Sequence, residues 1–99
     1  MKTTPIKEIV LKAAKAYKFS KYLKSFDDKK IDELCDYIER IINGEKITLK
    51  SPSYLKCVQI AGPMPKIHET TIRDIMWTLE IKGEICKCSS IIADAINKK

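Results

Sequence analysis

Apolar residues recur along most of this chain with the spacing of amphipathic helices. Between residues 6 and 17 they fall three or four positions apart, which places them on one face of a helix. Thr4 and Pro5 are suited to the cap and first position of this helix. The helical spacing continues over residues 19–26, after a bend near Ser20. The pattern therefore predicts a long N-terminal helix over roughly the first quarter of the chain.

A second apolar stripe runs from Ile31 to Ile42, with Asp27-Asp28 before it as cap residues and Asn43-Gly44 after it as a stop. Residues 46–50 then alternate between polar and apolar, which is typical of a short strand. The stretch from residue 27 to residue 50 is therefore predicted to be one helix followed by one strand.

The remaining half of the chain is interpreted by the same cap and spacing rules. It is predicted to hold a third helix from Ser51 to Gly62, a loop over 62–65, a fourth helix from about His68 to Gly83, a second short strand over 85–88 and a fifth helix beginning at Ser89 or Ser90. We expect one compact domain over residues 1–99, mostly α, with five helices and one or two short β-strands.

Charge is distributed very unevenly along this pattern. Residues 1–25 carry seven lysines and a single acid, Glu8, whereas residues 26–99 carry twelve basic and twelve acidic residues. The whole formal charge of +6 therefore belongs to the first quarter. A local excess of one sign selects anionic partners: nucleic acid, an acidic protein face or an anionic membrane. The alternative is a solvated helix face, although such faces usually mix both signs.

Residues 46–88 present a second signal. Their predicted order is strand, helix, turn, helix, glycine and strand, and residues 70–85 read TTIRDIMWTLEIKGEI. This stretch resembles the recognition helix and wing of winged-helix DNA-binding domains, in which the start of that helix enters the major groove. The resemblance implies base or phosphate contacts from Thr70, Thr71 and Arg73, with Lys66 nearby. The alternative is an ordinary core helix in a helical bundle.

Other chemistry has little basis in the sequence. A single histidine, scattered carboxylates and no glycine-rich phosphate loop give no catalytic constellation, so we expect no enzyme and no cofactor. Cys86-x-Cys88, with Cys35, Cys57 and His68, has poor spacing for zinc, and we predict no metal. The four cysteines are either thiols or two disulfides. No apolar run is long enough to span a membrane, and we expect an intracellular, cytoplasmic protein.

These observations predict a small basic nucleic-acid-binding protein, plausibly a transcriptional regulator of viral, phage or plasmid type, acting on DNA as a homodimer. Trp77 and Ile81 are candidates for the dimer surface. The candidate phosphate and base contacts are Lys12, Lys15, Lys18, Lys21, Lys24, Lys66, Thr70, Thr71 and Arg73. Tyr17, Phe19 and Tyr22 lie among the lysines and are candidates for stacking on unpaired bases. The alternative is a protein-interaction module that docks its basic helix on an acidic partner.

Overall fold

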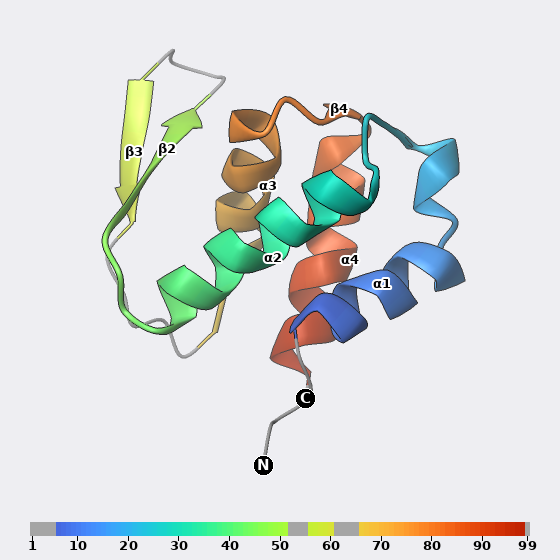
Figure 1. The fold of residues 1–99 in the computed structure, drawn as a ribbon, viewed down its shortest axis with the longest axis horizontal. Helices are drawn as coiled ribbons and strands as arrows, with labels where there is room; N and C mark the ends of the chain where they lie inside the picture. The colour runs from blue at the N-terminus through green and yellow to red at the C-terminus, as the bar shows by residue number, and fades with distance from the viewer. Residues whose placement is uncertain (1–5, 52–55, 61–65, 99) are drawn as a thin grey trace.

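The computed structural model describes residues 6–51, 56–60 and 66–98 (Figure 1). In chain order the elements are α1 (Ile6–Ala16), the 3₁₀ helix η1 (Phe19–Lys21), β1 (Leu23–Lys24), α2 (Asp28–Ile42), β2 (Ile47–Ser51), β3 (Lys56–Ile60), α3 (Glu69–Thr78), β4 (Lys82–Gly83) and α4 (Ile85–Asn97). The mostly α class is confirmed, with four α-helices in the described residues where five were predicted.

Helix α2 follows its sequence pattern closely. The Asp27 side chain accepts a hydrogen bond of 2.9 Å from the backbone N–H of Lys30, which caps the first turn. The helix ends at Asn43, and Gly44 then adopts the left-handed conformation with φ of 98°. The predicted apolar stripe is buried, and Leu34 and Ile38 are completely shielded from solvent.

The predicted third helix is wrong in the part that the structure describes. Residues 56–60 form β3, which pairs antiparallel with β2 from Ile47↔Ile60 to Ser51↔Lys56. The sequence KCVQI contains two β-branched residues, Val58 and Ile60, which favour a strand once β2 lies beside it. Residues 52–55 and 61–65, which include most of the predicted cap and loop, lie outside the described residues. The strand–helix–turn–helix order expected over 46–88 is therefore not observed.

Helix α4 begins four residues before its predicted cap. Residues 85–88, expected as a strand, form its first turn. Ile85, Cys88, Ser89, Ile92, Ala93 and Ile96 are the buried residues, and their alternating spacings of three and one place them on one helical face. The helical period of the whole segment overrides the short alternating run at its start.

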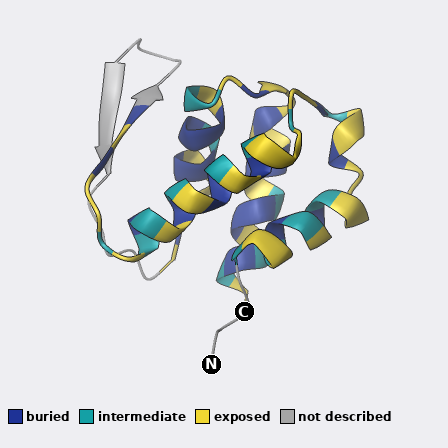
Figure 2. Ribbon diagram, viewed as in Figure 1, coloured by how far each residue is buried: buried dark blue, intermediate teal, exposed yellow. Residues whose placement is uncertain are grey.

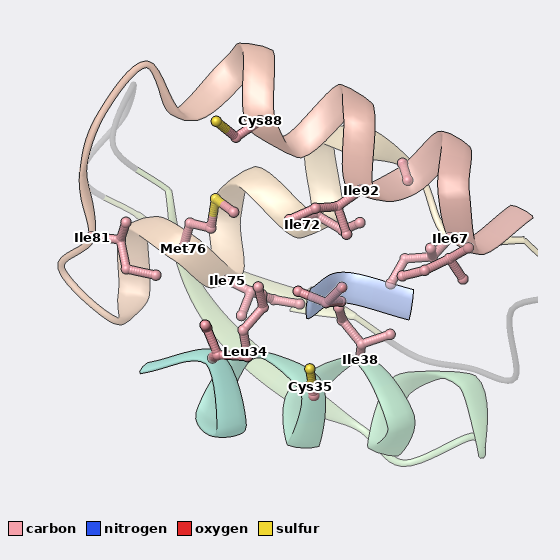
Figure 3. Packing of buried hydrophobic residues seen from close by; sticks show 14 of the residues in the cluster. Leu34, Cys35, Ile38, Ile67, Ile72, Ile75, Met76, Ile81, Cys88 and Ile92 are labelled. Carbon is pink, nitrogen blue, oxygen red and sulfur yellow. The ribbon is translucent and has the colours of Figure 1, made fainter. Parts of the chain in front are cut away.

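The core lies between α3 and the elements around it (Figure 3). Ile72, Ile75 and Met76 of α3 are fully buried, and α3 packs against α4, α2 and β2. At the far end of α4, the Asn97 side chain accepts from the Ile67 N–H at 3.0 Å and donates to the Ile67 carbonyl at 2.7 Å. These two hydrogen bonds fix the segment that leads into α3.

Candidate nucleic-acid interface

The lysines of residues 12–24, here called the basic arm, do not lie on one helix. Lys12 and Lys15 belong to α1, Lys18 follows that helix, Lys21 ends η1 and Lys24 lies in β1. The basic helix predicted over residues 1–25, with a bend near Ser20, is thus wrong after Ala16. All five lysines are nevertheless exposed, and exposed positions occur along α1 and η1 (Figure 2).

Two residues explain why the helix stops. Lys18 adopts a left-handed conformation with φ of 52°, a region that ends a right-handed helix. The turn carries Phe19 into the core, where only 1% of its surface is exposed. Burying a phenylalanine stabilises a fold by about 1.5–3 kcal/mol, which is enough to offset the cost of about 1–3 kcal/mol for one strained residue. Phe19 is therefore an anchor and is not available to stack on a base.

The ammonium groups of the basic arm face solvent without acidic partners. In the described ranges, no carboxylate lies within 4.0 Å of any of the five. The chain has no acidic residue between Glu8 and Asp27, which accounts for this locally. Just outside the arm the situation changes: Lys7 Nζ lies 2.7 Å from Asp32 on α2, and this hydrogen bond and charge raise the pKa of Lys7.

Strand pairing extends the positive surface with residues that sequence reasoning missed. β1 pairs antiparallel with β4, so that Lys24 lies directly opposite Lys82. Lys87, in the first turns of α4, places its Nζ 4.2 Å from the centre of the Tyr22 ring. The five lysines of the arm together with Lys82 and Lys87 are called the basic surface. Exposed acidic residues border this surface in the chain: Glu80 and Glu84 on either side of β4, and Asp27 three residues after Lys24.

Gly83 is what allows this pairing. Its φ is 123°, and a Cβ at this position would lie 2.0 Å from the Tyr22 carbonyl oxygen. The Glu84 N–H donates to the same carbonyl at 2.9 Å. The glycine was expected to end a helix, which it does not do directly, since α3 ends at Thr78. No local pattern in the sequence indicates a pairing between residues this far apart.

The candidates around α3 are placed less favourably for contact with DNA. Lys66 and Thr70 are exposed, but Thr71 is a core residue with 5% exposure. Arg73 is half-buried, and its Nη2 lies 3.6 Å from Oδ1 of Asp74, itself buried. The structure therefore does not display these four residues together on one reading face, as the prediction required.

One surface hollow does bring the two candidate regions near each other. A depression of about 640 Å³ is lined by Tyr17, which is half-exposed, and by Thr70 at the start of α3. Glu69 and Asp94 line it as well, so its walls carry acidic groups beside the exposed ring. Of the three aromatic residues predicted to stack, Tyr17 is the one most open to solvent, and Tyr22 is half-buried.

The predicted dimer surface is also corrected. Trp77 is 46% exposed on α3, as its position off the apolar stripe indicated, but Ile81 is 2% exposed. The Ile81 N–H donates to the Met76 carbonyl, which turns the residue inward after the helix. Trp77 therefore remains as an exposed ring without Ile81 beside it at the surface.

Three of the four cysteines are described, and all three are thiols. Cys35 and Cys88 are buried, Cys86 is exposed, and all three are free, which contradicts the two-disulfide alternative. Cys57 lies in β3, where side chains are not described. Burial raises the pKa of the Cys35 thiol to about 12 and that of Cys88 to about 11. Across the described residues, no three histidine, cysteine or acidic side chains are grouped as metal ligands would be.

The chain matches no protein-family model, no curated protein and no solved structure. Among the helices in the described part of the chain, none combines the length and apolarity needed to cross a bilayer. The function is therefore argued from the surface itself.

Proposed function

We propose that this protein binds nucleic acid through the basic surface. The observation that carries the proposal is the row of five exposed lysines whose ammonium groups have no carboxylate within 4.0 Å in the described residues. Elsewhere in the described chain, Lys7, Arg40 and Lys98 have such partners, whereas Lys29, Lys46 and Lys66 do not. The arm differs from these single lysines because no acidic residue lies between Glu8 and Asp27. Uncompensated charge concentrated on one surface creates the potential that attracts a phosphate backbone.

The placement of Lys82 supports the same function. Like charges directly opposite each other in a strand pair destabilise the sheet. Lys24 and Lys82 occupy such a pair, in a ribbon only two residues long. An anion held between the two ammonium groups would turn this repulsion into attraction. The Lys24–Lys82 pair therefore lowers stability at a position where its positive potential would favour binding of an anion.

The contacts available are those of phosphate binding more than of base recognition. Lysine is a flexible point charge that grips phosphates without geometric selectivity. The residues proposed to read bases are Thr70 and Arg73, since Thr71 is buried. We expect largely sequence-independent affinity, with Tyr17 as a candidate for stacking on an unpaired base. Regulation of transcription, the homodimer and the cytoplasmic location stay predictions from the sequence.

The test is a salt series read by fluorescence anisotropy, with a labelled duplex and a labelled single strand of random sequence. Two variants are compared, each losing two positive charges: Lys15→Gln with Lys21→Gln in the basic arm, and Arg40→Gln with Lys46→Gln at and beyond the end of α2, away from it. If both arm lysines touch phosphates of a duplex, the slope of log K against log salt becomes shallower by about 1.8. The control pair changes the net charge equally and is expected to retain the wild-type slope.

Two results would contradict the proposal. One is the absence of binding to either nucleic acid at about 50 mM salt, where phosphate contacts are strongest. The other is an equal loss of affinity in both double variants, because this would assign the binding to net charge and not to the basic surface.

A further inference from the structure

An apolar groove lies beneath the lysines of the basic arm. It has a volume of about 460 Å³ and is formed where α1, η1, β1 and the start of α2 meet. Six of its lining residues are apolar and the other four are polar: Leu11, Ala14, Phe19, Leu23, Phe26 and Ile31, with Lys15, Lys18, Ser20 and Lys21. Three lysines of the basic arm are thus also groove residues.

The fold holds this groove open through two strained corners. Lys18 and Ser25 have φ values of 52° and 64°, and they turn the chain between α1 and η1 and between β1 and α2. Phe19 and Phe26 each directly follow one of these corners, and their rings lie 6.1 Å apart, centre to centre. Phe19 is buried, whereas Phe26 and Leu11 remain half-exposed, so apolar surface is left accessible.

The chemistry of the groove selects among anionic ligands. A nucleobase carries hydrogen-bonding groups around its edge, and an apolar floor would leave them unpaired, which costs free energy. An apolar side chain such as leucine or phenylalanine loses nothing there. An apolar centre surrounded by charged groups is also the usual anatomy of a site where a protein segment docks.

We propose that this groove docks an acidic segment of a partner protein, with one or two apolar side chains of that segment in the groove and its carboxylates on Lys15, Lys18 and Lys21. Charge complementarity carries the choice of occupant. These lysines have no carboxylate within 4.0 Å in the described part of the chain. The inference does not depend on nucleic-acid binding, but the shared lysines make the two ligands mutually exclusive.

The probes are two labelled peptides of about fifteen residues, rich in glutamate and equal in charge. One carries leucines at positions i and i+4, and the other carries serines there. Binding is read by fluorescence anisotropy. We expect the leucine peptide to bind the wild-type protein at least about tenfold more tightly, because each leucine removed from water contributes to affinity. Amide chemical shifts of the wild-type protein should move most at Leu11, Ala14 and Phe26.

Two matched variants locate the site. Ala14→Leu adds a side chain within the groove, whereas Ala16→Leu adds the same group to an exposed position of α1 that does not line it. We expect the first to weaken the leucine peptide at least about fivefold and the second to leave its affinity unchanged. Melting curves establish whether both variants are folded. If Ala14→Leu does not fold, the amide chemical shifts of the wild-type protein still locate the site.

Equal affinity of the wild-type protein for the two peptides would overturn this inference, because the groove would then add nothing to the affinity that charge alone provides. Chemical-shift changes centred on another surface of the protein would also overturn it. Nucleic-acid binding is measured separately in the same preparation. The failure of one proposal is therefore distinguishable from the failure of the other.

Discussion

Helix α2 and the basic arm are both rich in charge, yet their charges serve different purposes. On α2 the two signs are mixed, and some of these charges are paired within the molecule: Asp32 pairs with Lys7 at 2.7 Å, and Arg40 pairs with Glu45 at 3.0 Å. Lys30 donates to the Leu79 carbonyl at 2.7 Å. The basic arm carries one sign only, and its charges point to solvent. Part of the mixed charge on α2 is thus paired within the fold, whereas the charge of the basic arm is of one sign and has no such partners, which is why we propose the arm as the ligand-binding surface.

The two regions also differ in how they contribute to stability. α2 buries five residues in the common core, and its ends are capped. The basic arm is held by a small number of features: Phe19 as an anchor, two left-handed corners and the short β1–β4 pairing. The predictions that follow test this division, beginning with the change expected to matter most.

The largest effect is expected from Ile38→Ala on α2. Ile38 is completely buried, and its truncation leaves a cavity in the centre of the core, which costs about 2–5 kcal/mol of unfolding free energy. Urea denaturation followed by circular dichroism measures the loss. The matched change in the arm, Lys15→Gln, should alter stability by less than about 0.5 kcal/mol. Similar losses for the two variants would contradict the division between a structural and a ligand-binding region.

Gly83→Ala tests the joint that holds the basic surface together. The added methyl group would lie 2.0 Å from the Tyr22 carbonyl oxygen, and φ at this position is 123°. We expect a loss of about 2 kcal/mol or more, because neither the contact nor the backbone angle suits alanine. The same variant should lose affinity for nucleic acid, since Lys82 no longer lies opposite Lys24. Wild-type stability in Gly83→Ala would show that β1 and β4 are not in this register.

The buried thiol of Cys35 predicts how stability depends on pH. Its pKa is about 12 in the folded state, above the ordinary value of 9.0. Below pH 9 the thiol is protonated in both the folded and the unfolded protein, so its full contribution to stability is present. Above pH 9 the unfolded state loses its proton first, so stability falls as pH rises toward 12, by at most about 1.4 kcal/mol per pH unit.

Cys35→Ala should therefore reduce the alkaline loss of stability relative to the wild type, measured by urea denaturation at about pH 8 and about pH 10.5. Cys86→Ala removes an exposed thiol and serves as the matched control. If Cys35→Ala loses as much stability between these pH values as the wild type does, the Cys35 thiol ionises in the folded protein as readily as in the unfolded one.

The sequence predicted those features that depend on local order. The apolar stripe of α2, its Asp27 cap and the start of α3 at His68 all follow from residues within a few positions. The errors occur where distant segments decide the outcome. Residues 56–60 become a strand because β2 offers them hydrogen bonds, and the helix before Phe19 ends because the core accepts that ring.

The candidate site shows the same limit. The lysines of the arm and their exposure were predictable, because charge of one sign is unfavourable in a core. Lys82 and Lys87 were not, since only the β1–β4 pairing and the packing of α4 bring them to the arm. Thr71 was misplaced because the start of α3 was expected to face solvent, whereas the residue is buried in a helix that packs against α4 and β2.

The mutation with the smallest expected effect on stability distinguishes most clearly between charges that stabilise the fold and charges that bind a ligand. Lys82→Glu places opposite charges at the Lys24–Lys82 pair and removes a repulsion. We expect stability to rise by about 0.5 kcal/mol, within the range for cross-strand charge pairs. The same change should weaken nucleic-acid binding and make its salt dependence shallower, because two positions of the basic surface are neutralised together.

Lys46→Glu is the control, since Lys46 is exposed and lies beyond the end of α2, away from the basic surface. It changes the net charge equally, and we expect little effect on either measurement. A stable Lys82→Glu variant that binds nucleic acid as the wild type does would remove β4 from the interface and leave the arm alone. A loss of both stability and binding would instead mean that Lys82 supports the fold. Only a gain in stability joined to a loss of binding fits a surface whose charges repel one another until a polyanion is bound.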